Sequence, residues 1–205
     1  EYDEIDLMIR QFQNTMMRMR YSSIPVVVAP HNMALGGGCE MTLHADRVQA
    51  HAELYTGLVE FGVGLIPAGG GTKELTLRVS DSIEEGDIEL NAYKNAFLNI
   101  GMAKVSKSAK EARELGILKP GDGITLNKDR QIRDAKTAVL EMADAGYTQK
   151  PMRKDVKVLG KQVLGMFYAG ANSMFAGNYI SEHDVKISQK LGYIMAGGDL
   201  SKPTF

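Results

Sequence analysis

Residues 25–75 read PVVVAPHNMALGGGCEMTLHADRVQAHAELYTGLVEFGVGLIPAGGGTKEL, and they carry most of what the sequence says about fold and function. A strand-like apolar run leads into three consecutive glycines at 36–38, and a second glycine cluster follows at 69–71. Between the two clusters stand two carboxylates, Glu40 and Glu60. Two carboxylates bracketed by glycine-rich turns suit general acid/base work on an anionic intermediate.

The first glycine cluster predicts a turn with exposed backbone N–H groups. Glycine lacks a Cβ atom, so a ligand can approach the backbone closely. A helix that begins near Gly37 leaves its first N–H groups without intrahelical partners, at the positive end of the helix dipole. An oxygen that gains negative charge would be stabilised there. Taken alone, the glycines also fit a tight strand-to-helix packing turn that binds nothing.

Each carboxylate also has a structural interpretation. Glu40 would lie in the first turn of the helix that begins near Gly37, where a negative charge complements the dipole. Glu60 stands in the apolar segment LYTGLVEFGVG, so it either faces solvent from a loop or is buried with a raised pKa. Singly each glutamate fits a structural role, whereas together with both glycine clusters they favour a catalytic pair.

Composition describes an ordinary globular protein. The 205 residues are 44% hydrophobic and 24% charged, enough for a substantial core. A formal charge of −1 argues against nucleic acid and against a membrane surface as partners. The single cysteine, Cys39, excludes an internal disulfide and fits a reducing compartment. The four histidines lack metal-ligand spacing, so we expect no metal site. We expect the protein to be cytoplasmic.

Apolar periodicity and glycine or proline breaks predict an α/β order of elements. Residues 146–154 (GYTQKPMRK) are the best candidate boundary, which gives a core at 1–146 and a helical region at 147–205. Strands are expected near 24–29 and 47–51, and helices over 3–20, 37–45, 70–79, 88–100, 108–116, 128–145, 154–177 and 181–196.

The motifs ALGGGCE and LIPAGGGTKEL, with Glu60 between them, resemble the signature of the crotonase (enoyl-CoA hydratase/isomerase) superfamily. The segment SAKEARELGIL is similar to a later family segment, so the resemblance covers about residues 22–120. The whole chain, including YISEHDVKISQKLGYIMAGGD, resembles the C-terminal part of a bacterial 3-hydroxyacyl-CoA dehydrogenase fusion. In such fusions a nucleotide-binding dehydrogenase precedes a crotonase-like module.

This resemblance implies a spiral of ββα repeats, trimer-based homo-oligomers and water addition to a 2-enoyl-CoA in fatty-acid β-oxidation. It also implies roles for individual residues: Gly37 gives one oxyanion-hole N–H, Glu40 and Glu60 are the catalytic pair, and Ala68 and Gly69 bind near the thioester. Two glutamates favour a hydratase over an isomerase. The chain departs from the family at Ala68, where hydratases usually have glycine.

The first residue, Glu1, opens directly onto a helix, so we expect an N-terminally truncated core. The family's second oxyanion donor comes from an N-terminal segment, and without it we expect this chain alone to be weakly active or inactive. No cofactor is expected in this chain: coenzyme A is part of the substrate, and NAD would bind only an upstream dehydrogenase domain. The alternative is a non-catalytic crotonase-like module that supports assembly or channelling in a larger dehydrogenase.

Overall fold

A computed structural model describes residues 1–205, and its elements are of the expected α/β class. The chain forms two compact units that alternate along the sequence. Unit 1 comprises residues 1–58, 68–71 and 105–152, and unit 2 comprises residues 59–67, 72–104 and 153–205. The expected division into residues 1–146 and 147–205 stays a prediction about domains.

Unit 1 contains all five strands and five of the helical segments. The strands are β1 (Val27–Val28), β2 (Met33–Leu35), β3 (Arg47–His51), β4 (Tyr55–Gly57) and β5 (Gly123–Thr125). The helices are α1 (Tyr2–Arg20), α2 (Gly37–His44), α5 (Ala109–Glu114), the 3₁₀ helix η2 (Lys128–Arg130) and α6 (Gln131–Asp144).

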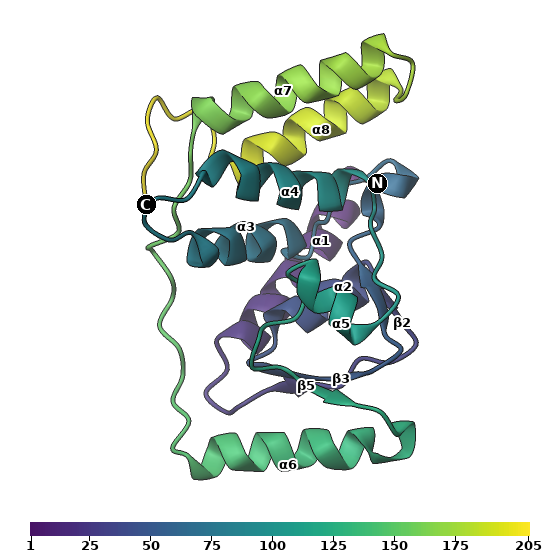
Figure 1. Cartoon of the computed structure of the whole chain (residues 1–205), viewed down its shortest axis with the longest axis vertical. Coiled ribbons are helices and arrows are strands. Elements are labelled where there is room, and N and C mark those ends of the chain that lie inside the picture. Colours follow the sequence, from purple (N-terminus) through teal and green to yellow (C-terminus); the bar gives the residue numbers. More distant parts are fainter. The chain divides into compact units, whose positions relative to one another are not determined.

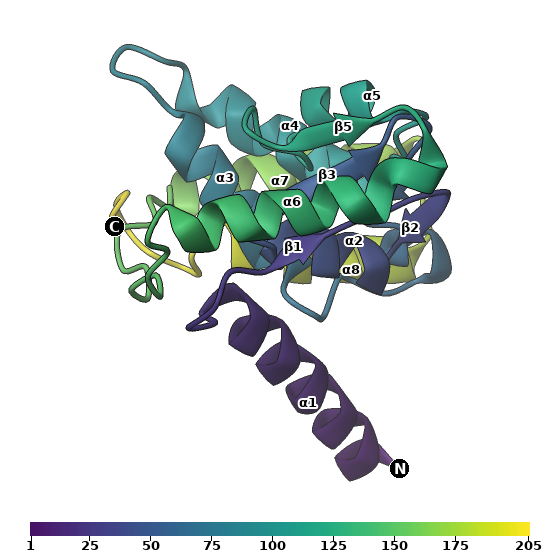
Figure 2. The ribbon, with the colours of Figure 1, turned by 90° about the horizontal axis from the view of Figure 1, so that it is seen from below.

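All strand pairs of unit 1 are parallel. One sheet has the order β1-β3-β5, with Val27 opposite Arg47 and Gln49 opposite Gly123. The other pairs β2 with β4, with Leu35 opposite Gly57. Helix α6 lies along the first sheet, whereas α1 extends away from the strands (Figure 2). Parallel strands need long crossovers, which here are supplied by helix α2 and by the chain between β3 and β5.

Polar side chains fix the register at the centre of the first sheet. Gln49 donates its amide N–H to the Thr125 hydroxyl at 2.8 Å. The Gln131 amide, at the start of α6, donates to the carbonyls of Pro30 at 2.8 Å and Gln49 at 2.9 Å. A Cβ atom at Gly123 would overlap the Gln49 amide, so a side chain there would displace the group that bonds Thr125.

Unit 2 contains the 3₁₀ helix η1 (Glu60–Val63), most of α3 (Gly71–Ser82), and the helices α4 (Glu89–Gly101), α7 (Lys161–Ala176) and α8 (Glu182–Met195). Helices α7 and α8 lie side by side (Figure 1). Ser181 starts α8 with a capping box, in which its hydroxyl accepts from Asp184 N–H and the Asp184 carboxylate accepts from Ser181 N–H. No helix of the structure combines the length and apolar character needed to cross a bilayer.

Helix α7 begins at Lys161, so its expected start at residue 154 is wrong. Gly160 has φ +56°, and a side chain there would overlap the carbonyl of Leu200, so the helix cannot extend backward through it. Before that glycine, Val158 forms an antiparallel bridge with Thr204. Val158, where the sequence pattern predicts helix, is therefore paired through its backbone with Thr204 near residue 205.

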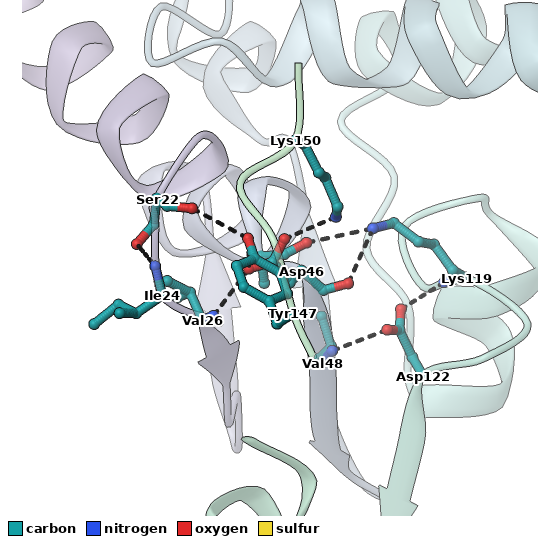
Figure 3. Close-up of polar contacts among 10 residues, drawn as sticks. Ser22, Ile24, Val26, Asp46, Val48, Lys119, Asp122, Tyr147 and Lys150 are labelled. Carbon is teal, nitrogen blue, oxygen red and sulfur yellow. Dashed lines mark hydrogen bonds and ion pairs between the residues drawn. The ribbon is translucent and has the colours of Figure 1, made fainter. Parts of the chain in front are cut away.

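A buried carboxylate, Asp46, joins three separate segments of unit 1 (Figure 3). Its side chain is fully buried and accepts hydrogen bonds from Val26 N–H at 2.9 Å and the Tyr147 hydroxyl at 3.0 Å. The Lys150 ammonium lies 2.7 Å from its other oxygen. Burial and the adjacent Asp46 charge raise the pKa of Tyr147 to about 12. The segment after α6 is thus attached to the start of β1 and β3.

Replacement of Asp46 by alanine should destabilise unit 1 strongly. Asp46→Ala leaves the Val26 N–H without its acceptor, removes one of the two acceptors of the Tyr147 hydroxyl and removes the partner of Lys150, which should lower the free energy of unfolding by about 2–4 kcal/mol. Tyr147→Phe removes only the hydroxyl that is shared between Asp46 and the Ser22 carbonyl, and it should cost about 1 kcal/mol. Urea denaturation of both variants measures the difference. Equal costs for the two would contradict this account of Asp46.

Candidate active site

The first glycine cluster forms the strand-to-helix turn that the sequence predicts. Strand β2 ends at Leu35, and Gly36 adopts φ 53° and ψ −120° before α2 begins at Gly37. The Gly36 N–H donates to the carbonyl of Gly57, which holds the turn against the end of β4 at 2.9 Å. Positive φ at Gly36 explains why glycine is needed there.

Gly37 presents its backbone N–H at the N-terminus of α2. As the first residue of the helix, its N–H has no partner within the helix. The residue is half-buried, and the ring of Phe12 from α1 lies next to it: a Cβ atom on Gly37 would be 3.1 Å from Phe12 Cζ. The Gly37 N–H, which the sequence predicts as an oxyanion donor, therefore lies next to the Phe12 ring.

Glu40 is buried in the same helix and hydrogen-bonds to the second glycine cluster. Its side chain is 1% exposed, and Oε1 accepts the Gly71 N–H at 2.8 Å. Gly71 is the first residue of α3. Glu40 lies in the first turn of α2, as expected of a residue that complements the dipole of its helix, and it also makes a direct hydrogen bond to the first residue of another helix.

Two opposing effects set the proton affinity of Glu40. Burial is the larger effect and raises the pKa of this carboxyl above its ordinary value. The backbone N–H groups of Gly71, Gly69 and Gly70 favour the ionised form and counteract part of that rise. The net result is a carboxyl group with increased proton affinity, held in a fixed position by backbone donors.

Gly69 lies directly against the Glu40 carboxylate. A side chain at Gly69 would overlap both Glu40 Oε2 and the ring of Phe12. A Cβ atom on Gly71 would be 2.7 Å from Leu58 Cδ2 and 3.0 Å from Glu40 Cγ. The absence of side chains in the second glycine cluster therefore lets the backbone approach the Glu40 carboxylate closely, so that three N–H groups stabilise its charge.

Helix α1 contributes two residues that the sequence reasoning did not assign to the site. The Phe12 ring contacts both glycine turns, and the next residue, Gln13, donates its amide N–H to the carbonyl of Ala68 at 2.8 Å. The available signal was the apolar periodicity of α1, which includes Phe12 but does not show what it covers. The structure thus gathers Gly37, Glu40, Ala68 and Gly69 around this part of α1.

Glu60 lies in unit 2, as the first residue of η1, and its side chain is half-buried. Its carbonyl accepts the Leu65 N–H at 3.0 Å, which closes the turn. The turn contains Gly64 at φ +77°, whose carbonyl accepts a hydrogen bond from His183 Nε2 of α8 at 2.7 Å. Glu60 is therefore carried by a short turn tied to α8 within its own unit.

The site formed by Gly37 and Glu40 in unit 1 can bind an anionic oxygen and can transfer a proton. The Gly37 N–H can donate a hydrogen bond to an oxygen that gains negative charge. Glu40, three residues further along the same helix, can take up or release a proton. Cys39, between them, is fully buried, as expected of a packing residue. No group of three His, Cys, Asp or Glu side chains is placed to hold a metal ion.

Comparison with known proteins gives this cluster a context. Residues 2–90, which include every predicted site residue, match the family described as Enoyl-CoA hydratase/isomerase. A Bacillus subtilis (strain 168) protein named "Probable 3-hydroxyacyl-CoA dehydrogenase" is 49% identical over 195 residues, which are 95% of this chain and 24% of that protein. An Arabidopsis thaliana protein named "Probable enoyl-CoA hydratase 2, mitochondrial" is 35% identical over 99 residues, 46% of this chain and 32% of the relative.

The crystal structure of an enoyl-CoA hydratase from Bacillus anthracis matches 95% of this chain and 62% of that protein, with a TM-score of 0.55 and 22% sequence identity. This similarity shows the fold, which confirms the expected crotonase-like architecture. The chain spans about a quarter of the length of its Bacillus subtilis relative.

Gly69→Ala should disrupt the packing of Gly69 against Glu40 and Phe12. The added methyl group must displace Phe12 or the Glu40 carboxylate, so we expect a loss of about 1–3 kcal/mol in the free energy of unfolding. Gly38→Ala is the matched control in the other turn, because its methyl group would meet Ala34 at an ordinary 3.6 Å. Thermal or urea denaturation compares them, and a Gly69→Ala protein as stable as Gly38→Ala would contradict the packing described.

The raised pKa of Glu40 predicts a pH-dependent stability difference between the wild type and Glu40→Gln. The folded protein holds this proton more tightly than the unfolded chain, so the contribution is full below the ordinary value of 4.5 and is lost as pH rises through the folded pKa. The free energy of unfolding of the wild type minus that of Glu40→Gln should therefore fall as pH rises from 4.5 towards neutrality. Each unit of pKa shift contributes about 1.4 kcal/mol.

Urea titrations of both proteins across this range measure the difference. A difference that stays flat would show no pKa shift on folding, and one that grows with pH would show that the fold favours the ionised carboxylate; either result would contradict a raised pKa.

Proposed function

We propose that the protein carrying this chain adds water across the 2,3-double bond of a 2-enoyl-CoA, as in fatty-acid β-oxidation, because residues 2–90 match the enoyl-CoA hydratase/isomerase family. The observation that carries the proposal is the Glu40 carboxyl, buried with a raised pKa three residues after the N–H of Gly37. A proton carrier beside a backbone oxyanion donor suits a reaction that passes through an enolate.

The thioester oxygen would accept the Gly37 N–H and gain charge as the nucleophile adds at C3. Losing one such backbone donor typically costs about 10²–10³ in rate. Ala68 and Gly69 would lie near the thioester, because Gly69 already contacts the Glu40 carboxylate. In the balanced reaction the hydroxyl group of water goes to C3 and a proton goes to C2.

Glu40 and Glu60 would share the two proton transfers. One carboxylate takes a proton from the attacking water, and the other carboxyl delivers a proton to C2, so no external base is consumed. A raised pKa brings Glu40 closer to neutrality, where a carboxyl group exchanges protons most efficiently. The presence of both glutamates favours hydration over isomerisation in this proposal.

The surrounding protein is part of the proposal. The similarity to a longer protein named for 3-hydroxyacyl-CoA dehydrogenase supports a hydratase-type module in a multifunctional enzyme. In that arrangement coenzyme A arrives as part of the substrate, and NAD would bind outside this chain. We propose a cytoplasmic, trimer-based homo-oligomer.

A second candidate is a non-catalytic crotonase-like module that supports assembly or substrate channelling in a larger dehydrogenase. The observation in its favour is that the matched region makes up only 24% of the Bacillus subtilis relative.

Glu40→Gln and Glu60→Gln, each made in the full-length protein, should lower the kcat of crotonyl-CoA hydration by about 10²–10⁴-fold while butyryl-CoA still binds. The physical reason is that an amide keeps the size and shape of the carboxyl group but cannot transfer its proton. Loss of the enoyl absorbance measures the rate, and calorimetry measures binding. Glu85→Gln, at an exposed loop carboxylate, is the matched control.

Full hydration by both variants would refute the catalytic assignment. A full-length protein that binds butyryl-CoA but shows no hydration before any substitution would instead favour the non-catalytic module.

A further inference from the structure

The ring of Phe12 in α1 lies next to both glycine turns of the candidate site. A Cβ atom on Gly37 would be 3.1 Å from Phe12 Cζ, and a side chain on Gly69 would overlap both the ring and Glu40 Oε2. The ring is therefore a direct neighbour of the buried carboxyl group as well as of the proposed oxyanion donor. Phe12, Gly37, Glu40 and Gly69 all belong to unit 1.

Helix α1 is held in place at this ring. The next residue, Gln13, donates its amide N–H to the carbonyl of Ala68 at 2.8 Å, and Met16, further along the helix, is 1% exposed. In the other direction the helix extends away from the strands, and Met8 is 62% exposed (Figure 2). Phe12 is thus the half-buried residue at which α1 passes from solvent to the site.

The two oxygens of the Glu40 carboxyl group meet different surroundings. Oε1 accepts the Gly71 N–H at 2.8 Å, whereas Oε2 lies on the side of the Gly69 turn that the Phe12 ring contacts. A phenyl ring offers no hydrogen bond, so it takes the place of water without replacing its solvation. This disfavours the ionised form, and burial is the largest effect on Glu40 and raises its pKa.

Charged side chains on the neighbouring helices have other partners. Arg10 of α1 pairs with Asp6 at 2.6 Å, and Lys73 of α3 pairs with the adjacent glutamate at 2.5 Å. On α2, Nδ1 of His44 lies 2.7 Å from the backbone carbonyl oxygen of Glu40. The causes of the pKa shift of Glu40 are burial and three backbone N–H groups, with no charged side chain among them. Apolar packing is therefore the feature that raises its proton affinity.

We propose that Phe12 is a positioning residue of this site, whose ring excludes water from the Glu40 carboxyl group and holds that group against the Gly69 backbone for proton transfer. The inference rests on the proposed function, because proton transfer by Glu40 is part of it. Phe12 exchanges no proton itself and acts through Glu40. The hydrogen bond from Gln13 to Ala68 keeps the ring in place.

Four substitutions in α1 separate this role from general packing. Phe12→Ala opens the site to water, whereas Phe12→Leu keeps an apolar side chain there. Gln13→Ala removes the hydrogen bond to Ala68 but leaves the ring, so the test does not depend on one variant folding. Met8→Ala is the matched control, because it removes an apolar side chain of the same helix, four residues before Phe12, that is 62% exposed.

A carbon-13 NMR titration of glutamate side-chain carboxyls in the full-length protein measures the pKa of Glu40, and circular dichroism checks folding. We expect Phe12→Ala to lower this pKa towards the ordinary value of 4.5, because water then solvates the ionised form. Gln13→Ala should lower it in the same direction by a smaller amount. Phe12→Leu and Met8→Ala should keep the wild-type value.

The pH dependence of crotonyl-CoA hydration gives a second readout. The profile of kcat/KM reports the ionisation of essential groups in the free enzyme. A lower pKa moves the limb that Glu40 sets to lower pH, whether Glu40 acts as base or as acid. In Phe12→Ala that limb should move to lower pH, and kcat should fall about tenfold. A purely structural role would reduce the amount of folded enzyme without moving the limb.

An unchanged Glu40 pKa in the folded variants Phe12→Ala and Gln13→Ala would overturn the proposal. A shift in Met8→Ala as large as that in Phe12→Ala would also overturn it, by assigning the effect to α1 as a whole. The NMR titration needs no chemistry, so a lowered pKa in a protein without hydratase activity would retain this role and refute the proposed function. Hydration with an unmoved pKa and limb would retain the function and refute the role of Phe12.

Discussion

The hydrogen bonding of the Glu40 carboxylate to the Gly69–Gly71 backbone is the interaction on which the candidate site depends. The carboxylate is 1% exposed and accepts the first N–H of α3, which links α2 to the turn before that helix. This approach requires glycine, because a side chain at Gly69 would overlap Glu40 and Phe12. The same burial that makes the carboxylate costly to ionise gives it the proton affinity that acid/base chemistry needs.

The long helices and the Gly37 turn were predictable from the sequence because each leaves a local signal. The apolar spacing of residues 3–20 predicts α1, which spans Tyr2–Arg20, and the paired glycines after Met195 end α8 with φ +74° and +92°. The three-residue strands β2, β4 and β5 carry no such signal, since an alternating pattern needs more residues to stand out. Their pairing depends on long-range contacts.

The parts of the site that escaped prediction all depend on tertiary placement. The sequence places Glu40 in the first turn of its own helix, but it does not show the hydrogen bond to Gly71, 31 residues further along the chain. Phe12 appears in the sequence as one apolar residue of an amphipathic helix, and only the fold brings it between the two glycine turns. Helix α7 begins later than its apolar pattern predicts, because Gly160 packs against Leu200 and Val158 pairs with Thr204, contacts that the local sequence does not show.

The central claim is that burial gives Glu40 an elevated proton affinity despite three nearby backbone N–H groups. The most direct measurement is a carbon-13 NMR titration of glutamate side-chain carboxyls, with the Glu40 signal assigned from its loss in Glu40→Gln. The account predicts a pKa above the ordinary value of 4.5, with the exposed glutamates titrating near that value. A Glu40 pKa at or below 4.5 would contradict the account, because the backbone donors would then outweigh burial.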